Sequence, residues 1–90
     1  MINEEVKADA LLRLRKIEGQ IKGISKMVDE EKYCINIINQ ITAAQRALDQ
    51  VALAIMKRHV ESCVSSAVKE GKGSGKIEEL METIDKFVRS

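Results

Sequence analysis

Apolar side chains recur at helical spacing in the first third of the chain. Between Val6 and Val28 they follow steps of three and four residues, which place them on one side of a helix. These positions are Leu11, Leu14, Ile17, Ile21, Ile24 and Val28. Gly19 and Gly23 interrupt the segment at a cost of about 1 kcal/mol each relative to alanine. The pattern predicts an amphipathic helix over 6–28, with both glycines allowing close approach by another backbone.

The second segment, residues 33–69, is long for a chain of 90 residues. It contains neither glycine nor proline and is rich in alanine, so nothing in it should end a helix. At about 1.5 Å of rise per residue, a helix of this length would extend about 55 Å. The polar residues 29–32 before it predict a short connection between antiparallel helices. Such a long helix also predicts a partner chain.

A third, shorter helix follows a glycine-rich break. Residues 70–75 carry three glycines that should end the second helix, and Ser74 is a candidate N-cap for the next one. Residues 76–88 regain helical spacing through Ile77, Leu80, Met81, Ile84, Phe87 and Val88. We therefore expect an all-α protein with a three-helix protomer, and a single domain over residues 1–90, because so short a chain supports only one core.

Composition narrows the functional classes. No stretch approaches about 18 consecutive apolar residues and no basic-then-apolar leader is present, so we expect a cytoplasmic protein without a membrane span. A net charge of +1 argues against coating nucleic acid by bulk charge. Residues 10–28 nevertheless carry five basic side chains and one acidic one, so a local positive face is expected.

The single histidine and the two cysteines all fall in the long helix. On an ideal helix, the steps from Cys34 to His59 and to Cys63 each come within about 20° of whole turns, so the three residues share one stripe. Cys34 would still lie about 38 Å from the level of His59 and about 43 Å from that of Cys63. One chain can therefore form neither a three-residue site nor a disulfide from them.

Two antiparallel copies of the helix would bring the three residues together. A two-fold axis near residues 46–48 places Cys34 of one chain level with His59 and Cys63 of the other, which creates two equivalent sites. Small residues at the expected crossing are Ala43, Ala44 and Ala47, and nearby apolar residues are Ile37, Ile41, Leu48, Val51 and Ile55. This arrangement predicts a homodimer whose sites lie between subunits.

Two thiolates and one imidazole without an evident fourth ligand favour Cu(I) over structural zinc. Cys34 has a competing use as a reactive thiol, because a helix N-terminus favours the thiolate.

Other interpretations stay open: either cysteine as a small buried apolar residue, Tyr33 as a packing residue, Glu79 as a solvated acid, and the basic residues as a solvated face. No carboxylate pair or second histidine is present for acid–base catalysis, so we expect no enzyme.

Four motifs resemble one known family. They are RLRKIEGQIKGI (13–24), YCINIINQI (33–41), HVESC (59–63) and IEEL (77–80). The chain resembles the CsoR/RcnR-like (CsoR/FrmR) transcriptional repressors, all-helical bacterial sensors of metals and thiol stress, over nearly its whole length. The resemblance implies the copper-sensing CsoR branch, in which Cys34 of one chain joins His59 and Cys63 of another around trigonal Cu(I). Nickel, formaldehyde and persulfide sensors of the family depart from this ligand set.

The same resemblance implies further roles. Tyr33 and Glu79 are similar to a pair that hydrogen-bonds around the His59 ring. The family binds operator double-stranded DNA as a disc-like tetramer, a dimer of dimers, through basic residues. By position these are Arg13, Arg15, Lys16, Arg46 and Lys57. Some copper sensors of the family carry arginine at the position of Gln50, where this chain has an uncharged amide.

The implied function is copper(I)-sensing repression. The apo form would bind its operator, and Cu(I) would release it to derepress copper-resistance genes. Two alternatives remain: a repressor that senses persulfides or electrophiles through Cys34 and Cys63, and a cytosolic copper-buffering helical dimer that binds no DNA.

Overall fold

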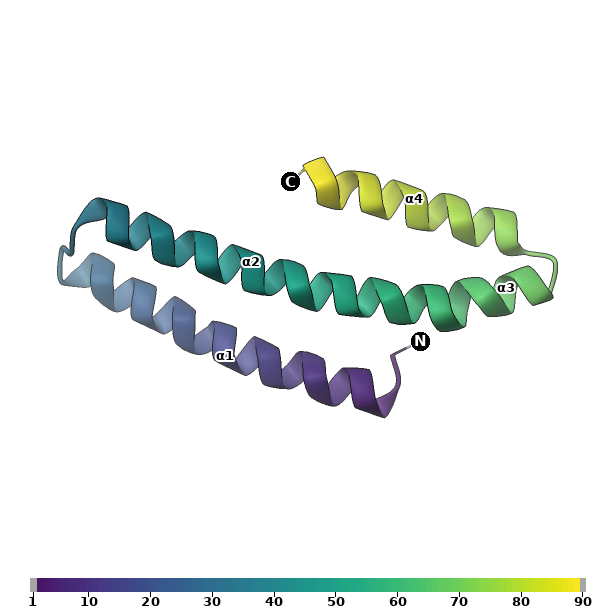
Figure 1. The fold of residues 1–90 in the computed structure, drawn as a ribbon, viewed down its shortest axis with the longest axis horizontal. Helices are drawn as coiled ribbons and strands as arrows, with labels where there is room; N and C mark the ends of the chain where they lie inside the picture. Colours follow the sequence, from purple (N-terminus) through teal and green to yellow (C-terminus); the bar gives the residue numbers. More distant parts are fainter. Residues whose placement is uncertain (1, 90) are drawn as a thin grey trace. The chain divides into compact units, whose positions relative to one another are not determined.

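The computed structural model describes residues 2–89, and this part of the chain is helical without any β-strand (Figure 1). In chain order, the elements are α1 (Glu4–Asp29), α2 (Cys34–His59), a π-helical segment η1 (Val60–Val64), α3 (Ser65–Lys69) and α4 (Gly73–Arg89). They form two compact units, Ile2–Ile55 and the residues from Met56 onward. The all-α class and the three predicted helical stretches are confirmed.

Capping residues set the start of α1. The side-chain oxygen of Asn3 accepts a hydrogen bond of 2.8 Å from the backbone N–H of Val6 and so satisfies one of the free donors of the first turn. Glu4 and Glu5 lie in that first turn and Lys26 lies in the last, which complements the helix macrodipole at both ends. The helix therefore begins two residues before the predicted start.

The turn from α1 to α2 uses a left-handed residue. Glu31 has φ 54°, and the N–H groups of Glu31 and Lys32 donate to the carbonyls of Val28 and Met27 at 3.1 and 2.9 Å. This is the Schellman pattern, in which glycine is the usual left-handed residue. The Tyr33 carbonyl then accepts from the N–H groups of Asn36 and Ile37 and starts α2, so Cys34 is the first residue of that helix.

The core of the unit Ile2–Ile55 joins α1 to α2. Ala10, Ile17 and Val51 are buried, and Leu14, Ala47 and Ile55 pack against them. Figure 1 shows the two helices side by side and antiparallel, as the short turn predicts. Full burial of an aliphatic side chain such as Ile17, which is 3% exposed, contributes about 1.5–3 kcal/mol. These contacts hold the first two helices together.

The contacts correct two predictions about helix faces. Val51 and Ile55, which we expected near the dimer stripe, pack in the core toward α1. Ile38, Ile41 and Leu48 instead stay exposed, and at about 100° per residue they lie within about 40° of Cys34 around α2. We call these four residues the Cys34 face. The core also uses Ala47, and Ala44 is buried, so neither small residue is exposed for a helix crossing.

The prediction for Gly19 and Gly23 is wrong within this chain. A Cβ atom added at either residue would meet nothing within 4 Å, so no backbone approaches them closely. Nothing else in the structure explains these glycines.

The unit from Met56 onward contains the end of α2, η1, α3 and α4. Helical backbone angles continue through His59, Val64 and Ser65, so the prediction that helix extends to Lys69 is correct. The prediction of unbroken α-helix is wrong at Val60–Val64, where the backbone bonds shift to the i→i+5 pattern. The ideal-helix phase assigned to Cys63 therefore does not apply across η1.

Glycines shape the turn into α4. Gly71 has φ 77°, and the N–H groups of Gly71 and Lys72 donate to Val68 and Ala67, which repeats the Schellman pattern of the first turn. An added Cβ at Gly73 would lie 2.6 Å from Val68 Cγ2 and 3.1 Å from Val68 Cα. This close approach requires glycine. Because α4 begins at Gly73, Ser74 lies inside the helix, and the prediction that it is the N-cap is wrong.

Between Ile2 and Arg89, no helix has both the length and the apolar character needed to cross a membrane.

Candidate metal centre and nucleic-acid interface

His59 directly precedes the π-helical segment, and Cys63 lies four residues further along, near the end of that segment. His59 is the last residue of α2, Cys63 lies inside η1, and both are partly buried. The Ser62 hydroxyl donates to the Arg58 carbonyl at 3.2 Å and lies 3.6 Å from Cys63 Sγ, within hydrogen-bonding distance of sulfur. The Ser65 hydroxyl donates to the Val60 carbonyl at 3.0 Å. Serine hydroxyls therefore support the backbone where two of the three proposed ligands lie.

Cys34 is exposed at the N-terminus of α2, in the other compact unit. Tyr33, the residue before Cys34, is 69% exposed. Glu79 lies on α4, where its carboxylate approaches the Lys76 ammonium at 3.8 Å and its carbonyl accepts from the Thr83 hydroxyl. The roles predicted for Tyr33 and Glu79 stay predictions.

Among the residues that the structure describes, no three His, Cys, Asp or Glu side chains converge on a metal position. Of the three predicted ligands, the structure brings His59 and Cys63 into one helical segment. Thiolate and imidazole donors suit soft and borderline metal ions such as Cu(I) and Zn²⁺. His59 and Cys63 therefore have donor atoms that suit such an ion, but the two residues alone do not complete a metal site.

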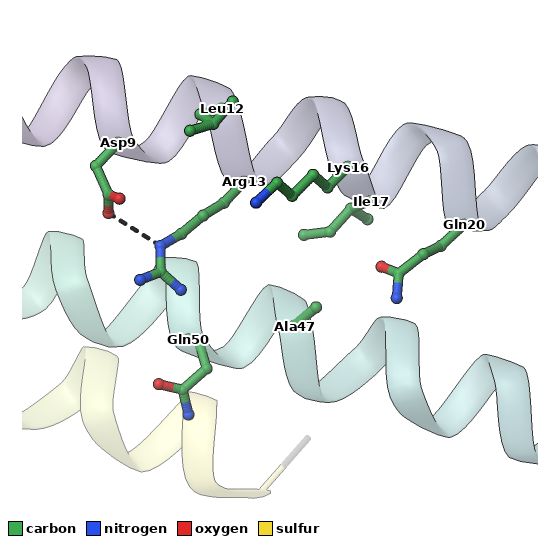
Figure 2. Close-up of a pocket in the computed structure, with 8 residues that line it drawn as sticks. All are labelled: Asp9, Leu12, Arg13, Lys16, Ile17, Gln20, Ala47 and Gln50. Carbon is green, nitrogen blue, oxygen red and sulfur yellow. Dashed lines mark hydrogen bonds and ion pairs between the residues drawn. The ribbon is translucent and has the colours of Figure 1, made fainter.

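A hollow of about 440 Å³ lies between α1 and α2 in the unit Ile2–Ile55 (Figure 2). Its lining consists of Asp9, Leu12, Arg13, Lys16, Ile17, Gln20, Ala47 and Gln50. Arg13 Nε donates to Asp9 Oδ2 at 3.0 Å, and both side chains are about half exposed. Figure 2 shows Arg13 and Gln20 reaching from α1 toward α2. The hollow thus places two cations beside two amide groups.

The five basic residues predicted to contact DNA are all exposed, and four of them belong to the unit Ile2–Ile55. Arg13 and Lys16 share the hollow, whereas Arg15 lines a separate depression with Glu4, Lys7, Ala8 and Leu11. Arg46 is exposed on α2 and is not among the residues that line either, and Lys57 belongs to the other unit. A search for charge alone overlooks Gln20, although it follows Arg13 by seven residues on the same helix face.

The chain matches one protein family over most of its length. Residues 6–86 match the family described as metal-sensitive transcriptional repressor. The chain is 44% identical over 78 residues to the copper-sensing transcriptional repressor CsoR of Bacillus subtilis (strain 168), covering 87% of this chain and 77% of that protein. It is 45% identical over 80 residues to the copper-sensing transcriptional repressor RicR of Mycobacterium tuberculosis (strain ATCC 25618 / H37Rv), covering 87% and 83%.

Two solved structures share the fold. The copper-sensing repressor CsoR with Cu(I) from Geobacillus thermodenitrificans NG80-2 matches with a TM-score of 0.90 and 41% identity, over 98% of this chain and 92% of that one. The nickel-responsive transcriptional regulator InrS matches with a TM-score of 0.77 and 36% identity, over 89% and 90%. Relatives of this fold therefore respond to more than one metal.

The all-α fold and these matches define the protein as a metal-sensing transcriptional repressor, which is not an enzyme. The chain belongs to the metal-sensitive transcriptional repressor family, as the four sequence motifs predict.

Proposed function

We propose that this repressor senses Cu(I) at a site formed between two subunits. Cys34 of one copy, with His59 and Cys63 of a second copy, would hold the ion. The observation that carries the proposal is the placement of His59 and Cys63 within one helical segment, with Cys34 exposed at the start of α2. Two thiolates and an imidazole match the preference of Cu(I) for soft and borderline donors.

Exposed apolar surface supports assembly through α2. Ile38, Ile41 and Leu48 are 55%, 39% and 44% exposed on the Cys34 face, where water would otherwise cover them. An antiparallel pair of α2 helices buries this face and aligns each Cys34 with the far end of its partner helix. Two such dimers would then form the disc-like tetramer. In this assembly, residues 1–90 act as a single sensing and DNA-binding domain.

The apo tetramer binds operator double-stranded DNA in this proposal. Exposed basic side chains supply the contacts with phosphate, namely Arg13, Arg15, Lys16, Arg46 and Lys57. The net charge of one chain is only +1, so pooling several subunits gives the positive surface that DNA binding requires. Binding should weaken steeply with salt, because each neutralised phosphate releases counterions. Such a regulator acts in the cytoplasm, where the operator lies.

Metal binding is linked to DNA release through the assembly. A ligand set shared by two chains ties the start of one α2 to the end of another and so favours one arrangement of the dimer. Tyr33 and Glu79 would orient the His59 ring, since a ligating imidazole usually donates its second N–H to a partner group. By reciprocity, bound DNA weakens Cu(I) binding by the same factor as Cu(I) weakens DNA binding.

Subunit complementation tests the shared site. Cys34→Ala and Cys63→Ala are each expected to lose three-coordinate Cu(I) binding. A mixed dimer of the two variants keeps one complete site, made from Cys34 of the second variant and Cys63 of the first. X-ray absorption and Cu(I) titration against a chelator should therefore find one high-affinity site per mixed dimer. A mixed dimer without such a site would refute a site shared between subunits.

The exposure of Cys34 at a helix N-terminus favours a second candidate, a repressor that senses persulfides or electrophiles through Cys34 and Cys63. Mass spectrometry after treatment with a sulfide donor distinguishes the two. A cross-link between Cys34 and Cys63 that releases DNA without copper would favour the second candidate.

A further inference from the structure

Ser62 directly precedes Cys63 in η1, and its hydroxyl lies within hydrogen-bonding distance of two groups. The hydroxyl donates to the Arg58 carbonyl at 3.2 Å, and its oxygen lies 3.6 Å from Cys63 Sγ. Because the hydroxyl proton points to the carbonyl, the thiol is the donor to the serine oxygen, which still has a lone pair to accept with. The three groups therefore form a short chain that runs from sulfur through hydroxyl to carbonyl.

We propose that Ser62 is a positioning residue of the Cu(I) site, and that its hydroxyl donates to the Cys63 sulfur once that sulfur holds the metal. The inference rests on the proposed function and deepens it. A thiol loses its proton to solvent when it ligates a metal, so the sulfur changes from a hydrogen-bond donor to an acceptor. The hydroxyl turns from the carbonyl to the sulfur and fixes the direction of the sulfur lone pairs. A serine oxygen is too hard a donor to ligate Cu(I) itself.

The turn of one hydroxyl also connects the metal to the helix backbone. The Arg58 carbonyl belongs to the last turn of α2, one residue before the proposed ligand His59. When the Ser62 hydroxyl donates to sulfur, this carbonyl loses the bond that it accepts in the metal-free chain. The metal-bound state of Cys63 therefore changes a hydrogen bond beside the second ligand of the same chain.

Raman spectroscopy of the apo protein tests the contact without copper. The sequence has two cysteines, so in Cys34→Ala the S–H stretching band reports on Cys63 alone. In that background, Ser62→Ala should move the band to higher frequency, because the thiol loses its acceptor. Ser62→Thr keeps a hydroxyl and should return the band toward its original position. Ser66→Ala is the matched control, since Ser66 is an exposed serine of α3, and it should leave the band unchanged.

Titration of Cu(I) against a chelator measures the effect on the metal in proteins that keep both cysteines. Ser62→Ala should weaken Cu(I) binding about tenfold, as is usual when a group that hydrogen-bonds to a metal ligand is removed. Ser62→Thr and Ser66→Ala should bind Cu(I) like the wild type. X-ray absorption should find three-coordinate Cu(I) in all of them, and circular dichroism must match.

The outcomes separate this inference from the function on which it rests. An S–H band that Ser62→Ala does not shift would refute the contact, and unchanged Cu(I) affinity of that variant would refute the positioning role. Loss of a coordinating atom in Ser62→Ala would also refute that role, because Ser62 would then be a ligand. If the wild type itself binds no Cu(I), the proposed function fails, even where the Raman band shifts as expected.

Discussion

The left-handed conformation of Glu31 predicts a stabilising substitution in the turn that leads into Cys34. Glu31 and Gly71 occupy the same position of two Schellman turns, with φ 54° and 77°, but only Gly71 is free of a Cβ atom. A left-handed conformation costs a residue other than glycine about 1–2 kcal/mol. The greater backbone freedom of glycine in the unfolded chain offsets about 0.5–1 kcal/mol of this. Glu31→Gly should therefore stabilise the fold by about 0.5–1 kcal/mol.

Thermal unfolding followed by circular dichroism measures this change. For a domain of this size, the expected gain raises Tm by about 2–8 °C. All proteins must be compared at one concentration, because assembly also shifts Tm. Glu31→Gln is the control, since it removes the charge but keeps the Cβ atom, and it should unfold near the wild-type temperature. A Glu31→Gly protein with an unchanged or lower Tm would refute the argument.

Three further substitutions test other parts of the structure. His59→Ala should retain Cu(I) on the two thiolates but lose the difference in operator affinity between the apo and Cu(I) forms. If anisotropy still shows that Cu(I) releases the variant fully from operator DNA, the role of the imidazole is contradicted. Gly73→Ala should lower the free energy of unfolding, measured in urea, by about 1–3 kcal/mol, because the added Cβ would overlap Val68. Gly75→Ala is the control, since a Cβ there meets nothing within 4 Å and should not destabilise the protein. Equal effects of the two substitutions would contradict the contact between Gly73 and Val68. Ser65→Ala removes the hydroxyl bond across η1 and should weaken that segment locally by about 1 kcal/mol, seen as faster amide exchange there, and unchanged exchange would contradict it.

Helical periodicity and helix breakers predicted most of the fold. The apolar steps in 6–28, the absence of breakers in 33–69 and the glycines of 70–75 locate the helices to within a few residues. The π-helical segment could not be predicted this way, because residues 60–64 contain no glycine or proline. The hydroxyl of Ser65 bonds across the widened turn, but its presence in the sequence does not predict that turn. Serine is also common in helices that have no such turn.

The faces of α2 were harder to assign than its length. Apolar residues surround much of this helix, so periodicity alone does not separate the side that packs on α1 from the side left for a partner. Helical spacing places Val51 and Ile55 on the partner side, and only the packing against Ile17 and its neighbours shows that they belong to the core. Ile41 and Leu48, which the sequence also places near the stripe of Cys34, stay exposed on the Cys34 face.

The candidate metal ligands came from the sequence, because histidine and cysteine are rare in this chain and their spacing is informative. Whether Cys34 meets His59 and Cys63 of another chain depends on assembly and stays a prediction. The hollow between α1 and α2 was not predicted, because Gln20 and Gln50 carry no charge and come from different helices. Only the packing of α1 on α2 brings them to one place.

Operator binding measured by fluorescence anisotropy, with and without stoichiometric Cu(I), tests the central claim most directly. The tetramer should bind operator DNA tightly in the apo form. Cu(I) should lower that affinity by about 5- to 150-fold, the usual range of allosteric coupling. Equal operator affinity of the apo and Cu(I)-loaded protein would contradict copper-sensing repression.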